Sequence, residues 1–170
     1  DCAAYACGWA YLGAQLVVAS DAAGTLYALW NANTVAQGAN RIYFATSANG
    51  GATWTPKVDV SSAPAGSAHA FPAIIARGSG DVRIGWMDAR AGALWNTWLR
   101  TSTNGGASWS SETDLSTYVA GFGYIQPAGY AYPYGDYWEL TIDGQGRTHA
   151  VWGEGLNYDS PGSIWYARAQ

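Results

Sequence analysis

The chain has 170 residues, a formal net charge of -4 and a charged fraction of only 12%, with Lys57 as its single lysine. A nucleic-acid-binding protein needs a basic stripe, and none is present. No apolar run approaches the ~18–20 residues of a membrane-spanning helix, so no membrane span is expected. Aromatic residues make up 15% and glycines number 22. This mixture predicts many short strands and tight turns rather than helices.

The first segment carries two cysteines, Cys2 and Cys7. Their separation permits a disulfide across a small loop, and it equally permits two free thiols. They do not form a CxxC redox pair, and the histidines, His69 and His149, do not complete a zinc site. The sequence therefore predicts no metal and no cofactor. The acidic balance and the scarcity of lysine favour a secreted protein, and the start at Asp1 indicates a processed or fragmentary chain.

Three repeats follow, and each contains a glycine turn that leads into an alternating strand ending in tryptophan. These strands are residues 24–30, 80–86 and 146–152. An apolar run precedes each glycine, and a further strand-like run follows each tryptophan. Each repeat therefore predicts a four-stranded antiparallel meander. Within a single domain, 1–170, the repeats cover about residues 13–60, 71–115 and 137–170, and the third stops before its fourth strand.

Four-stranded units that repeat at this period are typical of a β-propeller. The predicted fold class is therefore all-β, with about three four-stranded antiparallel blades of a propeller. Three blades cannot close a ring of the usual size, which is about four to eight blades. We expect a partner at the open ends, either an N-terminal propeller half or a second copy of the chain. In the second alternative, residues 8–12 would supply the missing strand of the partner's third repeat.

One octapeptide occurs twice, as Ser-Ala-Asn-Gly-Gly-Ala-Thr-Trp at 47–54 and as Ser-Thr-Asn-Gly-Gly-Ala-Ser-Trp at 102–109. Asn-Gly-Gly between two alternating runs predicts a hairpin turn, because the turn needs positive φ. The Asn and Ser side chains are expected to bond to the turn's backbone, and each Trp to be buried against its own blade. We assign the motif a structural role. Its residues are Ser47, Asn49, Gly51, Trp54, Ser102, Asn104, Gly106 and Trp109.

The octapeptide resembles the Asp-box, or BNR repeat, Ser-x-Asp-x-Gly-x-Thr-Trp, of sialidases and related propellers, with Asn49 and Asn104 where the family has Asp. Segments 71–74, 85–90, 134–137 and 148–154 also resemble secreted bacterial sialidase-like proteins. The resemblance implies a six-bladed propeller, of which this chain resembles the C-terminal half, and a glycan or other carbohydrate as ligand. Sialidases use three arginines, a Tyr–Glu pair and an Asp acid/base. The Arg-Ile-Pro motif is absent here, and no position can be assigned those roles by motif.

Propeller geometry places five loops on the face opposite the octapeptide turns, at about residues 31–40, 61–70, 88–96, 116–136 and 153–162. Asp136 and Glu154 flank strands of the third repeat, and two nearby carboxylates suit a glycosidase acid and base or nucleophile. Asp88 is a third catalytic candidate. Asp88 and Arg90 are alternatively a structural bridge. His149 is expected to be packed, and His69 to be more open to function.

Aromatic side chains with little charge suit sugar rings, whose C–H faces pack on aromatic rings. The alternative is that the tyrosines of loop 116–136 pack this loop onto its own propeller or onto a partner chain. The candidate substrate-binding residues are Arg90, Tyr124, Tyr130, Tyr132, Tyr134, Trp95 and His69.

Two functions remain open at this point. The first is a secreted glycan-acting or glycan-binding propeller, an exo-sialidase-like glycoside hydrolase if it is an enzyme, whose site is completed by another half or subunit. The second is a non-catalytic structural or protein-interaction module that self-assembles. Fold alone does not decide between them.

Overall fold

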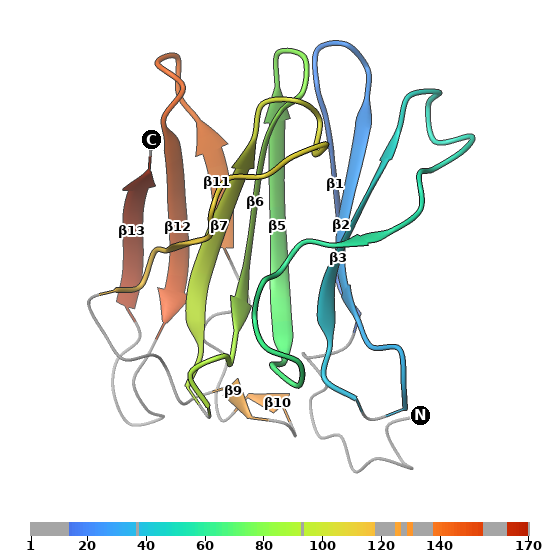
Figure 1. Cartoon of the computed structure of the whole chain (residues 1–170). Coiled ribbons are helices and arrows are strands. Elements are labelled where there is room, and N and C mark those ends of the chain that lie inside the picture. Colours follow the sequence, from blue (N-terminus) through green and yellow to red (C-terminus); the bar gives the residue numbers. More distant parts are fainter. Residues whose placement is uncertain are drawn as a thin grey trace.

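The computed structural model describes residues 14–36, 38–92, 94–117, 125–126, 129–130, 138–154 and 163–169. Every regular element in these residues is a β-strand, and every pairing between strands is antiparallel. This confirms the all-β prediction. Three sheets stand side by side, and a small two-stranded sheet lies at their lower end (Figure 1). No helix in these ranges is long and apolar enough to cross a membrane.

We call the three sheets blades 1, 2 and 3. Blade 1 consists of β1 (Leu16–Ser20), β2 (Leu26–Ala32), β3 (Arg41–Ser47) and β4 (Val58–Asp59) in that order. Blade 2 consists of β5 (His69–Arg77), β6 (Asp81–Asp88), β7 (Asn96–Ser102) and β8 (Thr113–Asp114). Blade 3 consists of β11 (Trp138–Ile142), β12 (Thr148–Glu154) and β13 (Ser163–Ala169). The small sheet pairs β9 (Ile125–Gln126) with β10 (Gly129–Tyr130).

The first strand of each blade lies on the inside of the arrangement. β5 contacts both β1 and β11, so the three first strands are neighbours. Each blade then continues outward in sequence order, as blades of a propeller do. The turns between first and second strands lie at the upper end in Figure 1, and the connections between second and third strands lie at the lower end.

Blades 1 and 2 share one apolar core. The buried side chains that form it are Tyr27, Leu29, Ile42, Phe44, Val60, Val82, Ile84 and Trp86. Blade 2 is covered on both sides, so seven of the eight residues of β6 are buried. β1 instead alternates between exposed and half-buried residues, because one face of blade 1 has no neighbour in the described chain.

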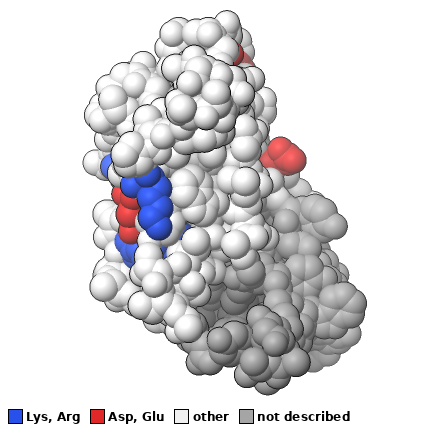
Figure 2. Space-filling model, turned by 90° about the vertical axis from the view of Figure 1, so that its right-hand side faces the viewer, with Lys and Arg blue, Asp and Glu red and all other residues white. Residues whose placement is uncertain are grey.

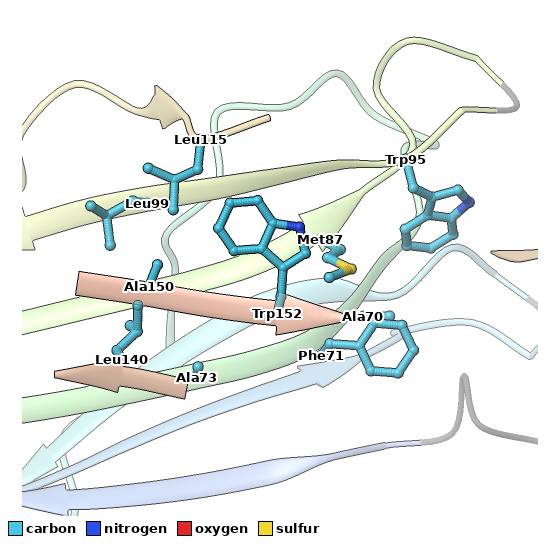
Figure 3. Packing of buried hydrophobic residues seen from close by; sticks show 10 residues of the cluster. All are labelled: Ala70, Phe71, Ala73, Met87, Trp95, Leu99, Leu115, Leu140, Ala150 and Trp152. Atoms are coloured by element: carbon cyan, nitrogen blue, oxygen red, sulfur yellow. The ribbon is translucent and has the colours of Figure 1, made fainter. Parts of the chain in front are cut away.

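A second core joins blades 2 and 3. It contains Ala70, Phe71, Ala73, Met87, Trp95, Leu99, Leu115, Leu140, Ala150 and Trp152 (Figure 3). Trp138 of blade 3 crosses closely over Gly85 of β6, where a Cβ atom would lie 2.0 Å from the indole ring. Glycine at position 85 therefore lets the two sheets approach, since any larger residue would collide with Trp138.

The two octapeptides form matching turns at the upper end. In the first, the Ser47 hydroxyl accepts from the Gly51 N–H at 2.9 Å, and the Asn49 side-chain oxygen accepts from the Thr53 N–H at 2.9 Å. The second repeats both bonds at the same distances, at Gly106 and Ser108. All four glycines of the two Gly-Gly pairs have positive φ. The predicted turns and the role of their Asn and Ser side chains are confirmed.

The expectation that both octapeptide tryptophans are buried against their own blades is wrong. Trp54 is 41% exposed, whereas Trp109 is partly buried. Trp109 packs edge-on against Phe44 of the preceding blade, with ring centroids 5.0 Å apart. Trp109 therefore packs on the preceding blade, and among the described residues no blade precedes blade 1.

A second type of turn, which the sequence analysis missed, caps the upper end of blades 1 and 3. The Asp21 carboxylate accepts from the backbone of Ala23 and Thr25, from the Tyr27 hydroxyl at 2.7 Å and from the Gly80 N–H of blade 2 at 2.8 Å. Burial opposes ionisation of Asp21, but these hydrogen bonds hold its pKa below the ordinary value. Burial and the adjacent carboxylate raise the pKa of Tyr27 to about 12.

Asp143 caps the corresponding turn of blade 3. Its carboxylate accepts from the N–H groups of Gln145 and Arg147 and lies 3.0 Å from His149 Nε2. The contact with His149, followed by the bonds from Arg147, lowers the pKa of Asp143. Both turns have Asp three residues before a glycine with positive φ, a spacing that was readable in the sequence.

Candidate functional site

The lower end gathers the residues at which β1, β5 and β11 begin and at which β2, β6 and β12 end (Figure 1). The described parts of the loops predicted to carry function lie here, on the side away from the octapeptide turns. Three features of this end are built from named side chains: a bulge at Phe71, a buried histidine at position 69, and a charged cluster around Asp88.

The start of β5 is a strained bulge that side chains from both neighbouring blades hold in place. The pairing of β5 with β6 shifts register between Ala70 and Ala73. Phe71 has φ 54°, the positive region that L-residues rarely adopt. Its N–H donates to Gln15 Oε1 at 2.8 Å, and its carbonyl accepts from Trp138 Nε1 at 2.6 Å. Such backbone costs about 1–3 kcal/mol and clusters at functional sites.

Asn31 extends this clamp within blade 1. Its side-chain oxygen accepts from the Gln15 N–H at 2.6 Å, and its amide donates to the His69 carbonyl at 3.3 Å. Asn31 is fully buried. The start of β5 is therefore held by hydrogen bonds from residues of blades 1 and 3. We call this place, where Gln15, Asn31 and Phe71 meet, the inner rim of the lower end.

His69, which the sequence places in a loop and which was expected to be more open to function than His149, is instead the first residue of β5, with 1% of its surface exposed. Its Nδ1 lies 2.9 Å from the carbonyl oxygens of Asn40 and Ser67, which fixes the proton on Nδ1. Its Nε2 accepts from the Ser61 hydroxyl at 2.7 Å and lies 3.6 Å from Asp88 Oδ2. Burial lowers the pKa of His69 and outweighs the opposing effect of Asp88, so the ring is neutral at pH 7.

Asp88 and Arg90 form the structural bridge that the sequence left as one alternative. Asp88 is fully buried and accepts from Trp86 Nε1 at 2.8 Å and from the Arg90 guanidinium, with the closest contact at 2.6 Å. Arg90 also pairs with Glu112 and stacks over the Trp98 ring at 3.7 Å. These contacts engage the Arg90 guanidinium within the cluster.

Glu112 links this bridge to blade 1, and the sequence analysis missed it. Its carboxylate accepts from the N–H of Ser62 at 2.6 Å and from the hydroxyl at 2.7 Å. Burial opposes ionisation, but the bonds from Arg90 and Ser62 lower the pKa of Glu112. The cluster thus ties the outer strands of blades 1 and 2 together near the lower end.

The other predicted site residues differ in where they lie. Trp95 is buried in the core between blades 2 and 3. Glu154 ends β12, where its backbone pairs with Ser163 of β13, and the backbone of Tyr130 pairs with Ile125. Several others lie outside the described residues, namely Asp136, Tyr124, Tyr132, Tyr134, Cys2 and Cys7.

Within the described ranges, no group of three or more His, Cys, Asp or Glu side chains could hold a metal ion. The polar residues that converge on the inner rim are instead Gln15 and Asn31, which the sequence analysis did not single out. Asn31 could have been found from the sequence, because it is a polar residue directly after Trp30, the tryptophan of a strand expected to be buried, and buried polar groups need hydrogen-bond partners.

The neutral state of buried His69 makes stability depend on pH. Below its ordinary pKa of 6.5 the unfolded chain binds a proton that the folded chain resists. Stability is therefore expected to fall as pH drops from 6.5 to 5, by at most about 1.4 kcal/mol per pH unit for this one group. Urea unfolding across this range measures the slope, and His69→Gln is expected to flatten it. An unchanged slope in that variant would contradict the assignment.

Comparison with known proteins yields fold likeness alone. No family model matches the chain, and no curated protein matches it in sequence. Among solved structures, the alpha-L-arabinanase of Penicillium chrysogenum, complexed with arabinobiose, is 14% identical with a TM-score of 0.59, over 91% of this chain and 46% of that one. A Hadza microbial sialidase is 13% identical with a TM-score of 0.59, over 91% of this chain and 34% of that one.

The alpha-L-arabinofuranosidase of Fusarium graminearum, in complex with arabinobiose, is 17% identical with a TM-score of 0.56, over 92% of this chain and 45% of that one. The chain thus spans less than half the length of each of these three proteins. Its fold is that of sialidase-like and arabinanase-like β-propellers.

Proposed function

We propose that this chain is one half of a secreted, glycan-acting propeller, and that its lower end contributes to the active site of an exo-acting glycoside hydrolase. The fold supports the proposal, because the solved structures that share it include an arabinanase, an arabinofuranosidase and a sialidase. The other half of the ring, from another segment or subunit, completes the site. The acidic, lysine-poor composition supports secretion.

The observation that carries the proposal is the register of blade 3. β11 and β12 pair Trp138 with Trp152, two residues before Glu154. We propose that Asp136, which lies outside the described residues, stands opposite Glu154, two positions beyond this pair. Directly opposed residues have Cβ atoms about 4.5–5.5 Å apart. Retaining glycosidases hold their two carboxyl groups about 5–5.5 Å apart, a separation within reach of Asp and Glu side chains on opposed residues, so we propose this pair as acid/base and nucleophile.

The occupied arginines favour a neutral sugar over sialic acid. Binding a sugar carboxylate calls for free guanidinium groups. Arg41, Arg77, Arg83, Arg90 and Arg147 each pair with a carboxylate of the chain, and Arg100 donates to carbonyl oxygens of Val60 and Ser110. The seventh arginine, Arg168, is exposed and pairs in register with His149, at the end of β13 away from Glu154. In the proposal, the aromatic platform for a neutral ring is formed by Tyr124, Tyr130, Tyr132 and Tyr134.

Hydrolysis of a glycan panel tests the function, with arabino-oligosaccharides, sialyllactose and aryl glycosides as substrates. We expect release of a neutral terminal sugar, reduced about 10²–10⁴-fold by Asp136→Asn or by Glu154→Gln. Glu139→Gln is the matched control, because Glu139 is an exposed carboxylate of the neighbouring β11. Full activity in both amide variants would remove the pair from the mechanism.

A non-catalytic interaction module is the second candidate. The contacts of Asp88, Arg90 and His69 favour it, because their polar side-chain atoms are bonded to other residues of the chain. Self-association with neither hydrolysis nor binding of any glycan in the panel would support this alternative.

A further inference from the structure

Two sheet faces, one at each end of the row of blades, expose large apolar side chains within the described part of the chain. The backward face of blade 1 exposes Leu16 at 65%, Val18 at 55% and Trp54 at 41%. The forward face of blade 3 exposes Ile164 at 77% and Tyr166 at 60%. Large apolar side chains grouped in this way mark an interaction surface.

The residues of the backward face occupy repeat positions that are buried in blade 2. Pairing register places Val18 opposite Ala28 in blade 1, as Ile74 lies opposite Ile84 in blade 2. Ile84 belongs to the core against blade 1, and Ile74 packs on that core. Trp54 likewise corresponds to Trp109, which packs on Phe44. The backward face therefore has the side-chain pattern of a surface that another blade covers.

The forward face has the same relationship to blade 1. Val151 pairs with Tyr166 in blade 3, as Leu29 pairs with Phe44 in blade 1. Leu29 and Phe44 are buried at 0% and 4% beneath blade 2. Tyr166 is thus the counterpart of the ring that receives the octapeptide tryptophan of the next blade.

A polar anchor is repeated as well. In blade 1, Asp21 binds Tyr27 and also accepts the Gly80 N–H of the next blade. In blade 3, Asp143 binds His149, the residue at the position of Tyr27. Asp143 of blade 3 is therefore the counterpart of Asp21, whose carboxylate accepts a hydrogen bond from the turn of the following blade.

The backward face is concave and nearly uncharged. It forms a shallow hollow of about 370 Å³, lined by Gln15, Leu16, Val18, Ala28, Trp30 and Trp54. Figure 2 looks onto this side of the molecule, where white, uncharged surface dominates the described part and charged side chains gather mainly along one edge. An apolar sheet face, rather than a charged ligand, suits this hollow.

We propose that the forward face of one chain packs on the backward face of a second copy, and that two copies related by a two-fold axis form one ring. The contact continues the interface between blades 1 and 2, with Trp54 of one copy against Tyr166 of the other. The chain forms three blades, so two copies bring six blades to one ring, within the usual range of about four to eight. This inference rests on the proposed function only in that the ring encloses its site.

Sedimentation with charge variants tests the proposal on the intact chain, without any sugar. We expect wild type at tens of micromolar to have twice the chain mass of 18.0 kDa. Ile164→Asp on the forward face, or Val18→Asp on the backward face, is expected to yield monomers. Both side chains are exposed in the single chain, so each variant should fold. Val35→Asp is the matched control, since Val35 is 65% exposed in the β2–β3 connection, and it should stay dimeric.

Mixing the two monomeric variants separates head-to-tail closure from other modes of association. Each ring has two identical contacts, and the mixture retains one contact with both faces intact. An equimolar mixture is therefore expected to recover a heterodimer, seen by native mass spectrometry. A monomeric wild type, dimers in either single variant, or a mixture that stays monomeric would overturn the proposal. Hydrolysis by a monomeric wild type would contradict the two-copy ring alone. A dimer that hydrolyses no sugar of the panel would contradict the proposed function alone.

Discussion

Asp88→Ala is expected to lower the free energy of unfolding by about 3–5 kcal/mol, because it removes one partner of a buried ion pair. The carboxylate is fully buried and accepts from the Trp86 indole and from the Arg90 backbone and guanidinium. Without it, the indole N–H has no acceptor and Arg90 retains Glu112 alone as a carboxylate partner. Urea unfolding monitored by tryptophan fluorescence measures the loss.

A matched control for this substitution is Asp59→Ala. Asp59 pairs with Arg41 at 2.8 Å, but its side chain is 36% exposed, and such pairs contribute about 0–1 kcal/mol. Equal losses in the two variants would show that the buried cluster does not hold blades 1 and 2 together as described.

Trp109→Ala is expected to cost about 3 kcal/mol, while Trp54→Ala costs less than about 1 kcal/mol in the single chain. The two tryptophans end the same octapeptide, but only Trp109 has a ring of the preceding blade, Phe44, to pack against. The comparison is made by denaturant unfolding in the Ile164→Asp background, which is expected to keep the chain monomeric. Similar costs at both positions would contradict the role assigned to the neighbouring blade.

The same pair should differ in its dependence on concentration when the forward face is intact. A contact made by a second copy stabilises the folded chain by mass action. The cost of Trp54→Ala is then expected to rise with protein concentration, whereas that of Trp109→Ala should change little.

Local features of the fold were predictable from the sequence. Asn-Gly-Gly specifies its turn through backbone conformation and short-range hydrogen bonds, so the contacts of Asn49 and Asn104 follow from the residues themselves. The alternating runs that end in Trp86 and Trp152 likewise predict the second strands. The exposure of Trp54 was not predictable in this way, because it depends on whether another blade packs against blade 1.

The candidate site was less predictable, because its contacts join distant segments. The spacing of Asp88 and Arg90 fits a bridge or a ligand site equally, and Glu112, which joins the bridge, lies 22 residues further along. The positive φ of Phe71 depends on Gln15 and Trp138, which belong to other blades. The turn at Asp143, by contrast, repeats the spacing of the turn at Asp21 and could have been found.

Hydrogen exchange with and without a bound sugar tests most directly whether the lower end is the glycan site. The sugar is the best substrate of the hydrolysis panel, added to the Glu154→Gln variant so that it is not consumed. We expect slower exchange in segments 69–71 and 88–95 and at the start of β11, with no change in the octapeptide turns at 47–54 and 102–109. Protection confined to those turns, or absent throughout, would contradict the account.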